Sequence, residues 1–466
     1  MKPEHSPSLK TTGFFHQLFR SIFPYPLIPK SDQERKRYLL KNLILHFRPP
    51  TVPEKTLKFS LTWGLGGMAA LLIILQFGTG LLLKFVYKPI PVAAYSSIQM
   101  LQNEVMFGYL IRNIHHWCAN FLVLIVFLHM LRVFFTGAFH PPRQFSWIIG
   151  LGLFGLVLTA NFTGYLLPYD QLAYWAVTVS TGMLEYIPVV GNRLQEIIQG
   201  GNEIGPATLS IFFAIHTAVV PVGLIILMAF HFWRIRKTGG LVIPRASGEE
   251  IEIKPVRVPT LPHLLLREVV VALVLVAVVM MVSVSFDAPL GDSANPGLSP
   301  NPTKAPWYFA GLQELLLHLH PLFAVFIIPL VLVVTLMGIP YLKYDTNTAG
   351  IWFASIKGRG MALIAGFIAI VAAPMGILAD EYLIDFAAGL SGIPTFFGNG
   401  LIPFAFIFFG CAGFYILIKH RYSATNNEAA QALFVFILVV FLILTVTGTW
   451  FRGPGMKLTW PWNIHV

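Results

Sequence analysis

The chain has 466 residues, of which 56% are hydrophobic and 11% are charged, and its mean hydropathy is +0.70. This is too much apolar surface for a water-soluble protein. We therefore expect an integral membrane protein. Its formal net charge of +11 follows a topological pattern, described below, and does not indicate nucleic-acid binding.

The first segment, residues 1–58, is basic and carries an interrupted apolar patch that lacks the form of a secretory signal peptide. We expect this patch to lie as an amphipathic segment on the cytoplasmic membrane surface. Its apolar residues are Phe14, Phe15, Leu18, Phe19, Ile22 and Phe23.

Nine apolar stretches follow, each long enough to cross a hydrocarbon core about 30 Å thick, which takes about 20 helical residues. The expected fold class is therefore all-α, a polytopic transmembrane helical protein. A hydrophilic linker at residues 241–262 separates four stretches from five. The stretches lie near residues 60–86, 108–136, 145–167, 207–235, 264–286, 321–342, 360–380, 396–419 and 431–451.

The basic residues orient these stretches. If the N-terminus lies in the cytoplasm, 25 of the 32 Lys and Arg residues fall on the cytoplasmic side. This agrees with the positive-inside rule and predicts a multi-pass protein of the bacterial cytoplasmic membrane, in contact with lipid.

Two of the stretches carry paired histidines. His115 and His129 are fourteen residues apart in the second stretch, and His216 and His231 are fifteen apart in the fourth. Either interval is about four helical turns, so each pair shares one helix face with about 21–23 Å between its members. Two such helices facing each other would form two bis-histidine sites. This pattern favours two haems over the alternative of isolated hydrogen-bonding histidines.

Glycines repeat the same interval in the first and third stretches. Gly66 and Gly80 are fourteen residues apart, as are Gly150 and Gly164. A flat macrocycle between helices needs residues with almost no side chain where its edge meets the backbone. We therefore expect these four glycines to line the haem sites.

Arginines lie near the ends of the second stretch, where haem propionates would need cationic partners. Arg112 precedes His115 by three residues, and Arg132 follows His129 by three. Arg143 lies just beyond the stretch and is read equally well as an ordinary interfacial arginine.

These segments resemble the cytochrome b family of the cytochrome bc complexes, the quinol:cytochrome c or plastocyanin oxidoreductases. The resemblance covers about residues 35–345, and the fifteen-residue histidine interval is similar to that of the b6f type. In that type the chain is split where this one has its hydrophilic linker, so the cytochrome b and subunit IV parts look fused here. The matching segments are residues 66–80 with Gln76, 107–117, 128–143, 164–177 and 214–240.

The resemblance implies that two b-type haems are bound, one near the outer face by His115 and His216 and one near the inner face by His129 and His231. It implies that quinol is oxidised at the outer side and that electrons cross the membrane in a Q cycle coupled to proton translocation. The implied partners are a Rieske iron–sulfur protein, a cytochrome c-type acceptor, quinone and a second copy of the chain in a homodimer within a larger complex.

The quinol pocket departs from the family pattern. The family's Pro-Glu-Trp-Tyr motif appears as Ala305, Pro306, Trp307 and Tyr308, so its proton-accepting glutamate is missing. Glu314 could supply a carboxylate base in this apolar setting, or could only pair with His318. In the related split form a similar departure suits low-potential quinones, so the resemblance leads us to expect menaquinol as the substrate. His318, His320 and, more weakly, Asp170 are further candidates for the proton acceptor.

The cysteines also limit the cofactors. Cys118 and Cys411 both lie in apolar stretches and no C-x-x-C-H motif occurs, so we expect no c-type haem attached by this chain. The position of the b6f-type haem-binding cysteine corresponds to Gly64, and we expect two haems rather than three. Both cysteines are expected to be buried small residues.

The expected organisation is a basic segment (1–58), a di-haem four-helix bundle (59–240), a hydrophilic linker (241–262), a subunit IV-like part with the quinol-pocket loop (263–345) and additional helices with an outer tail (346–466). Asp380, Glu381 and Asp385 are expected in a solvated outer loop. The rival function is a haem b membrane anchor that passes electrons between quinone and a dehydrogenase or hydrogenase without bifurcation.

Overall fold

A computed structural model describes residues 30–41, 48–246, 249, 255–344, 349–384 and 392–463. The expected amphipathic patch at residues 14–23 and Asp385 lie outside the described residues. The chain divides into two compact units, Met1–Lys58 with Glu252–Val270, and Phe59–Ile251 with Val271–Val466.

In the first unit, a short antiparallel pair of strands joins two distant parts of the chain. Thr51 pairs with Pro259, Val52 with Val258 and Pro53 with Arg257. Arg48 Nη2 lies 3.0 Å from Glu268 Oε2. The elements are α2 (Asp32–Lys41), β1 (Thr51–Pro53), η2 (Glu54–Leu57), β2 (Arg257–Pro259) and the first turns of α12 (Thr260–Ser285).

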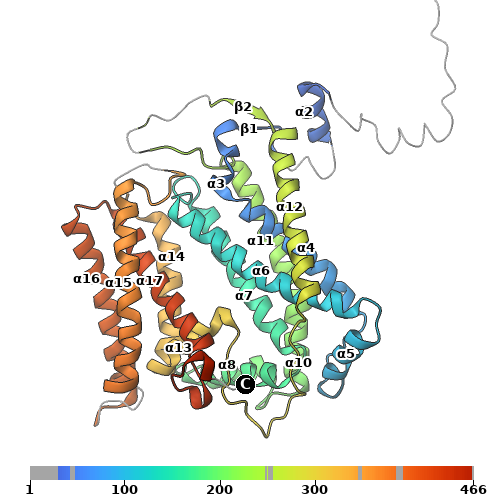
Figure 1. The fold of residues 1–466 in the computed structure, drawn as a ribbon, viewed down its shortest axis with the longest axis vertical. Helices are drawn as coiled ribbons and strands as arrows, with labels where there is room; N and C mark the ends of the chain where they lie inside the picture. The colour runs from blue at the N-terminus through green and yellow to red at the C-terminus, as the bar shows by residue number, and fades with distance from the viewer. Residues whose placement is uncertain are drawn as a thin grey trace, which may run out of the picture. The chain divides into compact units, whose positions relative to one another are not determined.

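The second unit is almost entirely helical (Figure 1). Its first half contains α3 (Phe59–Thr62), α4 (Leu65–Lys84), α5 (Pro91–Asn103), α6 (Gly108–Phe135), α7 (Gln144–Leu166), α8 (Gln171–Gly182), η3 (Met183–Tyr186), α9 (Gly191–Gln199), α10 (Pro206–Ala214), the π turn η4 (Ile215–Val219) and α11 (Val220–Lys237).

After the remainder of α12, the second half contains α13 (Trp307–His318), η5 (Leu322–Ile327), α14 (Ile328–Gly338), η6 (Ile339–Tyr341), α15 (Ile356–Ala379), the π turn η7 (Asp380–Ile384), η8 (Phe396–Leu401), α16 (Ile402–Arg421), α17 (Asn426–Trp450), η9 (Pro454–Met456) and η10 (Pro461–Asn463). Figure 1 shows α15, α16 and α17 side by side.

Nine helical segments of the described chain are long and apolar enough to cross a membrane, which confirms the expected all-α class. Two of them begin earlier than their apolar runs because polar side chains cap them. Ser355 accepts a hydrogen bond from the N–H of Gly358 at the start of α15. Thr425 and Glu428 form a reciprocal capping box at the start of α17.

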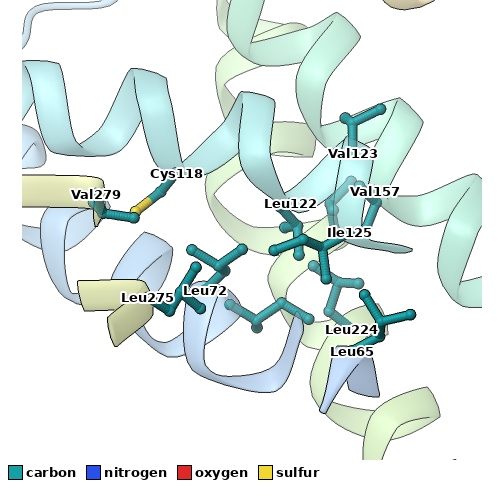
Figure 2. Packing of buried hydrophobic residues seen from close by; sticks show 12 residues of the cluster. Leu65, Leu72, Cys118, Leu122, Val123, Ile125, Val157, Leu224, Leu275 and Val279 are labelled. Carbon is teal, nitrogen blue, oxygen red and sulfur yellow. The ribbon is translucent and has the colours of Figure 1, made fainter. Parts of the chain in front are cut away.

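The largest hydrophobic cluster of the second unit joins α4, α6, α7, α11 and the later part of α12. Leu72 and Cys118 are completely buried in it. Figure 2 shows Cys118 beside Val279 of α12. Cys118 therefore lies where a small apolar residue is needed, as expected, while Cys411 on α16 is partly exposed.

Candidate functional site

The four histidines form two pairs. The ring centroids of His115 on α6 and His216 in η4 are 6.2 Å apart, and the ring planes meet at 75°. His129 on α6 lies near His231 on α11. Each pair thus joins a histidine of α6 to a histidine from the η4–α11 segment. These are the helices that the matched intervals in the sequence predicted to face each other.

Hydrogen bonds fix the orientation of the first pair. His216 Nδ1 lies 3.0 Å from the carbonyl oxygen of Ala160, which can only accept. His115 Nδ1 lies 2.9 Å from Thr79 Oγ1, and that hydroxyl already donates to the Leu75 carbonyl. Both imidazoles therefore carry their proton on Nδ1. This leaves both Nε2 lone pairs available to a metal.

The backbone of the same helix is held as well. Gln76 Nε2 donates to the carbonyl oxygen of His115 at 2.9 Å. The side chains of Gln76 and Thr79 thus fasten α4 to α6 at the level of His115. Gln76 was among the residues expected to act at the cofactor site, whereas Thr79 was not, because nothing in its local sequence distinguishes it from other threonines in apolar helices.

Each of the four spaced glycines faces one histidine. A Cβ atom placed on Gly164 would lie 2.6 Å from His216 Cε1, and one on Gly80 would lie 3.2 Å from His115 Cε1. The corresponding distances are 3.4 Å from Gly66 to His129 and 3.8 Å from Gly150 to His231. The expectation assigned these glycines to a macrocycle edge, but their nearest neighbours here are the imidazoles.

This donor set fits a bis-histidine haem. A histidine nitrogen lies about 2 Å from the metal that it binds, so two axial imidazoles on one iron have centroids roughly 6 Å apart. The His115–His216 separation matches this. Among the described residues no group of three or more His, Cys, Asp or Glu could hold a metal ion, so two imidazoles suit a macrocycle that brings its own equatorial donors.

The arginines differ in what they bind. Arg112 donates to the carbonyls of Ala288 at 2.8 Å and Pro289 at 2.6 Å. Arg132 is 5% exposed and its Nε donates to the Leu61 carbonyl, but its buried Nη2 has no partner among the described residues. A buried unpaired guanidinium nitrogen is costly, so Arg132 fits an anionic group such as a haem propionate.

Arg143 is held by the loop after α11. Its Nη2 lies 3.2 Å from the Thr238 carbonyl oxygen and 3.3 Å from that of Gly240. Its Nε has no partner in the described part of the chain. Burial lowers the pKa of its guanidinium.

Gly64 is the residue that the resemblance equates with the haem-binding cysteine of the b6f-type chain. It adopts a left-handed φ of +68° as the N-cap of α4. A Cβ there would lie 3.1 Å from Val271 Cγ1. Both the backbone conformation and the packing therefore favour glycine at this position.

Three of the residues expected at the quinol pocket lie near the start of α13 or α8. Trp307 Nε1 donates to Asn120 Oδ1 on α6 at 2.8 Å. Tyr308 packs against the main hydrophobic cluster, and burial raises the pKa of its hydroxyl. Asp170 accepts hydrogen bonds from the backbone N–H groups of Ala173 and Gly291, so its carboxylate acts as an N-cap and loop anchor here.

Glu314 is completely buried and paired. Arg452 approaches it with Nη2 at 2.6 Å from Oε1 and Nε at 3.0 Å from Oε2. His318 Nε2 lies 3.3 Å from Oε1. This geometry favours the second of the two interpretations of Glu314, in which it pairs with His318, and it adds Arg452, which the sequence analysis did not assign.

The cluster continues to the end of α15. His318 Nδ1 hydrogen-bonds to Asp380, and Arg452 Nη1 lies 2.9 Å from Glu381 Oε2. We call Glu314, His318, Asp380, Glu381 and Arg452 the buried charge cluster. The expectation that Asp380 and Glu381 belong to a solvated loop was wrong, because Asp380 is only 9% exposed and Glu381 is salt-bridged.

A signal for Arg452 was present in the sequence. Only seven Lys and Arg residues fall on the expected outer side, and Arg452 follows directly after the last apolar stretch. A cation in a place where cations are rare needs a partner or a function. Its partners could not be named, since Glu314 is 138 residues away.

Comparisons with known proteins support the reading of the first half. Residues 53–239 match the family model described as cytochrome b/b6/petB. Cytochrome b6 of Heliomicrobium gestii is 46% identical over 188 residues, which are 40% of this chain and 87% of that protein. Cytochrome b6 of Synechococcus elongatus (strain ATCC 33912 / PCC 7942 / FACHB-805) is 45% identical over 175 residues, 38% of this chain and 81% of that protein.

The fold extends further than this sequence similarity. A solved chain described as "Hyperthermophilic respiratory Complex III" superimposes with a TM-score of 0.61 and 23% identity, over 88% of this chain and 96% of that chain. At this identity the match shows a shared fold. The sequence relatives, most of whose length this chain covers, show that the chain belongs to the cytochrome b/b6 family.

Proposed function

We propose that this chain is the di-haem cytochrome b subunit of a Rieske/cytochrome b quinol oxidoreductase. Quinol, preferentially menaquinol, is oxidised at the outer side, and electrons cross the membrane by way of two b haems in a Q cycle coupled to proton translocation. Cytochrome b/b6 proteins bind b-type haems and take part in electron transport. The number and ligands of the haems in this chain are part of the proposal.

The observation that carries this proposal is the geometry of the His115–His216 pair. Both rings carry Nδ1–H, held by Thr79 and Ala160, which leaves both Nε2 atoms available to a metal, and the ring centroids are 6.2 Å apart. His129 and His231 would hold the second haem. When bound, haem iron gains and loses single electrons, with a potential set by its axial ligands and burial.

The protein's own residues would position and shield the groups. The glycines let the imidazoles approach α4 and α7 closely, Arg132 offers its unpaired Nη2 to a propionate, and Arg143 offers its Nε. Arg112 would contribute partly by holding the loop after α12, through its hydrogen bonds to the carbonyls of Ala288 and Pro289. The apolar cluster around Leu72 and Cys118 excludes water between the two levels.

The proposed partners are a Rieske iron–sulfur protein, a cytochrome c-type acceptor and a second copy of this chain. The fold shared with a respiratory complex III chain supports such an assembly. The proposed division is a di-haem bundle at residues 59–240, a subunit IV-like part at 263–345 and further helices at 346–466. We propose the bacterial cytoplasmic membrane as its location, with the N-terminus in the cytoplasm.

The test is a spectroscopic one on the complex purified from its native membrane. A reduced-minus-oxidised spectrum should show two b-type centres, and quinol should reduce them. A colourless chain, or one whose haem survives loss of both His115 and His129, contradicts the proposal.

The alternative is a haem b anchor for a dehydrogenase or hydrogenase. The hydrogen bond from Trp307 to Asn120 favours the quinol-oxidising subunit, because it ties the quinol-pocket loop to the helix that carries His115. Co-purification with a Rieske protein would support bifurcation. Co-purification with a dehydrogenase and no iron–sulfur partner of the Rieske type would favour the anchor.

A further inference from the structure

The buried charge cluster contains more carboxylates than cations. Glu314 and Glu381 contact the guanidinium of Arg452, and His318 lies between Glu314 and Asp380. Burying unbalanced charge is costly, and a titratable group in such a place takes or releases a proton to reduce that cost. Within the cluster, His318 is the one side chain that can add a second positive charge.

The hydrogen bonds of His318 point to the same proton. Its Nε2 faces Glu314 and its Nδ1 faces Asp380. A neutral imidazole has one N–H donor, while an imidazolium has two. Two ionised carboxylates can both be satisfied only when the ring is protonated. In the Glu314–His318–Asp380 triad, the His318 ring is therefore an imidazolium, with one exchangeable proton that a neutral ring would lack.

Other charged groups of the described chain near the cluster have partners of their own. The ammonium of Lys304 donates to the Thr449 carbonyl at 3.0 Å. His320, which the sequence also offered as a proton acceptor, packs against the rings of Tyr186 and Phe396. It lies outside the buried charge cluster, so the structure does not favour it for this role. Arg452 is occupied by Glu314, Glu381 and the Met456 carbonyl.

The direction of the pKa shift agrees. Burial alone would lower the pKa of His318, but its hydrogen bonds to Glu314 and Asp380 outweigh burial and leave the pKa above its usual value of 6.5. Burial would raise the pKa of Glu314, but hydrogen bonds from His318 and Arg452 leave it below 4.5. The exchangeable proton therefore belongs to the imidazole.

The position of the triad suits the missing glutamate of the quinol pocket. Trp307, Glu314 and His318 are spaced by seven and four residues, so they share one face of α13. The exposed fraction of the side chains rises from 0% at Glu314 to 13% at His318 and 24% at Glu381. The cluster thus leads from a buried carboxylate to the protein surface.

We propose that His318, held between Glu314 and Asp380, is the proton-relay residue for quinol oxidation in this chain, with Arg452 as the positioning residue that keeps Glu314 ionised. The proposal rests on the proposed quinol-oxidising function. Oxidation of a hydroquinone to the quinone releases two electrons and two protons. The electrons go to a b haem and to a one-electron iron–sulfur acceptor. The imidazolium first gives one N–H proton to water at the surface. One quinol O–H proton then moves, directly or through water, to restore that N–H bond, and the second quinol proton is released to water.

The test compares His318→Gln with His320→Gln in the intact complex. Gln at 318 keeps hydrogen-bonding atoms but cannot carry the proton, and His320 lies two residues away without a carboxylate partner among the described residues. Proton transfer by a positioned group contributes about 10²–10⁴-fold. We expect His318→Gln to slow quinol oxidation by about a hundredfold and to flatten its pH profile, with normal haem spectra. His320→Gln should stay within about twofold of the wild type.

A second readout does not depend on turnover. Infrared difference spectra of the complex, recorded across the titration range of histidine, should show imidazole deprotonation that disappears in His318→Gln and persists in His320→Gln. A wild-type pH profile in His318→Gln, or no histidine signal lost in that variant, overturns the proposal. Failure of the wild type to oxidise any quinol would instead overturn the proposed function, while the infrared titration would still decide whether the triad holds a proton.

Discussion

The two halves of the second unit organise polar groups in different ways. In the helices that carry the histidines, each functional side chain meets a glycine or a hydroxyl on a neighbouring helix, and the contacts repeat at a fixed interval along the chain. In the helices from α13 onward, three distant segments meet once, at the buried charge cluster. The first arrangement suits a rigid cofactor held at two levels, and the second suits a single local site.

The two halves also differ in the charge of their polar groups. As the proposed haem ligands, the histidine pairs would be neutral donors to a metal and would need only room and orientation. The buried charge cluster needs charge balance, so loss of one member should disturb the others. Variants of the first half should therefore act on cofactor content, and variants of the second on stability and proton transfer.

The largest effect is expected from His129→Leu. This change removes one axial ligand, so the chain should lose the haem of the His129–His231 pair and keep the other. A haem assay with redox titration measures it, and His116→Leu on the same helix is the control. Loss of both haems, or of neither, would break the view that the two levels are independent.

Alanine substitutions at the four spaced glycines test whether the histidine rings need to lie close to the glycine backbone. Gly164→Ala places a Cβ 2.6 Å from His216 and should reduce occupancy of that haem strongly, whereas Gly150→Ala meets His231 only at an ordinary 3.8 Å. Gly80→Ala and Gly66→Ala should be intermediate. Haem-to-protein ratios measure the series, and equal effects at Gly164 and Gly150 would contradict this explanation.

Arg452→Met tests the charge balance of the second half. It leaves the fully buried Glu314 without its guanidinium, and breaking such a pair costs about 3–5 kcal/mol. We expect a lower thermal midpoint in detergent, a smaller loss in the double variant Arg452→Met/Glu314→Leu, and almost none in Lys457→Met, which alters an exposed side chain. A stable single variant would show that the cluster is not charge-coupled.

Glu314→Gln should have a smaller effect, about 1–3 kcal/mol for a lost charged hydrogen-bond partner. Quinol oxidation should slow while haem content stays normal. Because the pKa of Glu314 lies below 4.5, the ionised form stabilises the fold above that pH. The difference in thermal midpoint from the wild type should therefore be constant near neutrality and shrink as the pH falls below about 4.5. A difference that grows in acid would reverse the assigned sign.

The helices of the first half, and the residues that share a helix face, could be predicted for a physical reason. The intervals between His115 and His129 and between Gly66 and Gly80 are set by the helix repeat, so the chain itself records which residues share a face. The nine membrane-crossing segments were predictable from apolar length in the same way.

The second half could not be predicted from spacing. Glu314 and Arg452 are 138 residues apart and Arg452 and Glu381 are 71 apart, so their contact depends on how α13, α15 and α17 pack. Thr79 illustrates the same limit in the first half, because its acceptor role for His115 exists only once α4 lies against α6. Local pattern indicates which residues are unusual, but tertiary packing decides what they touch.

The π turn η4 explains why the two histidine intervals differ. A π turn absorbs one extra residue within a helix, and His216 lies inside it. The fifteen-residue interval can therefore present its two imidazoles along the same side as the fourteen-residue interval does in the unbroken α6. An insertion at this point changes the count of residues without changing the register of the ligands. Relatives with fourteen residues here should show an uninterrupted α-helix, and alignments should place the gap within Ile215–Val219.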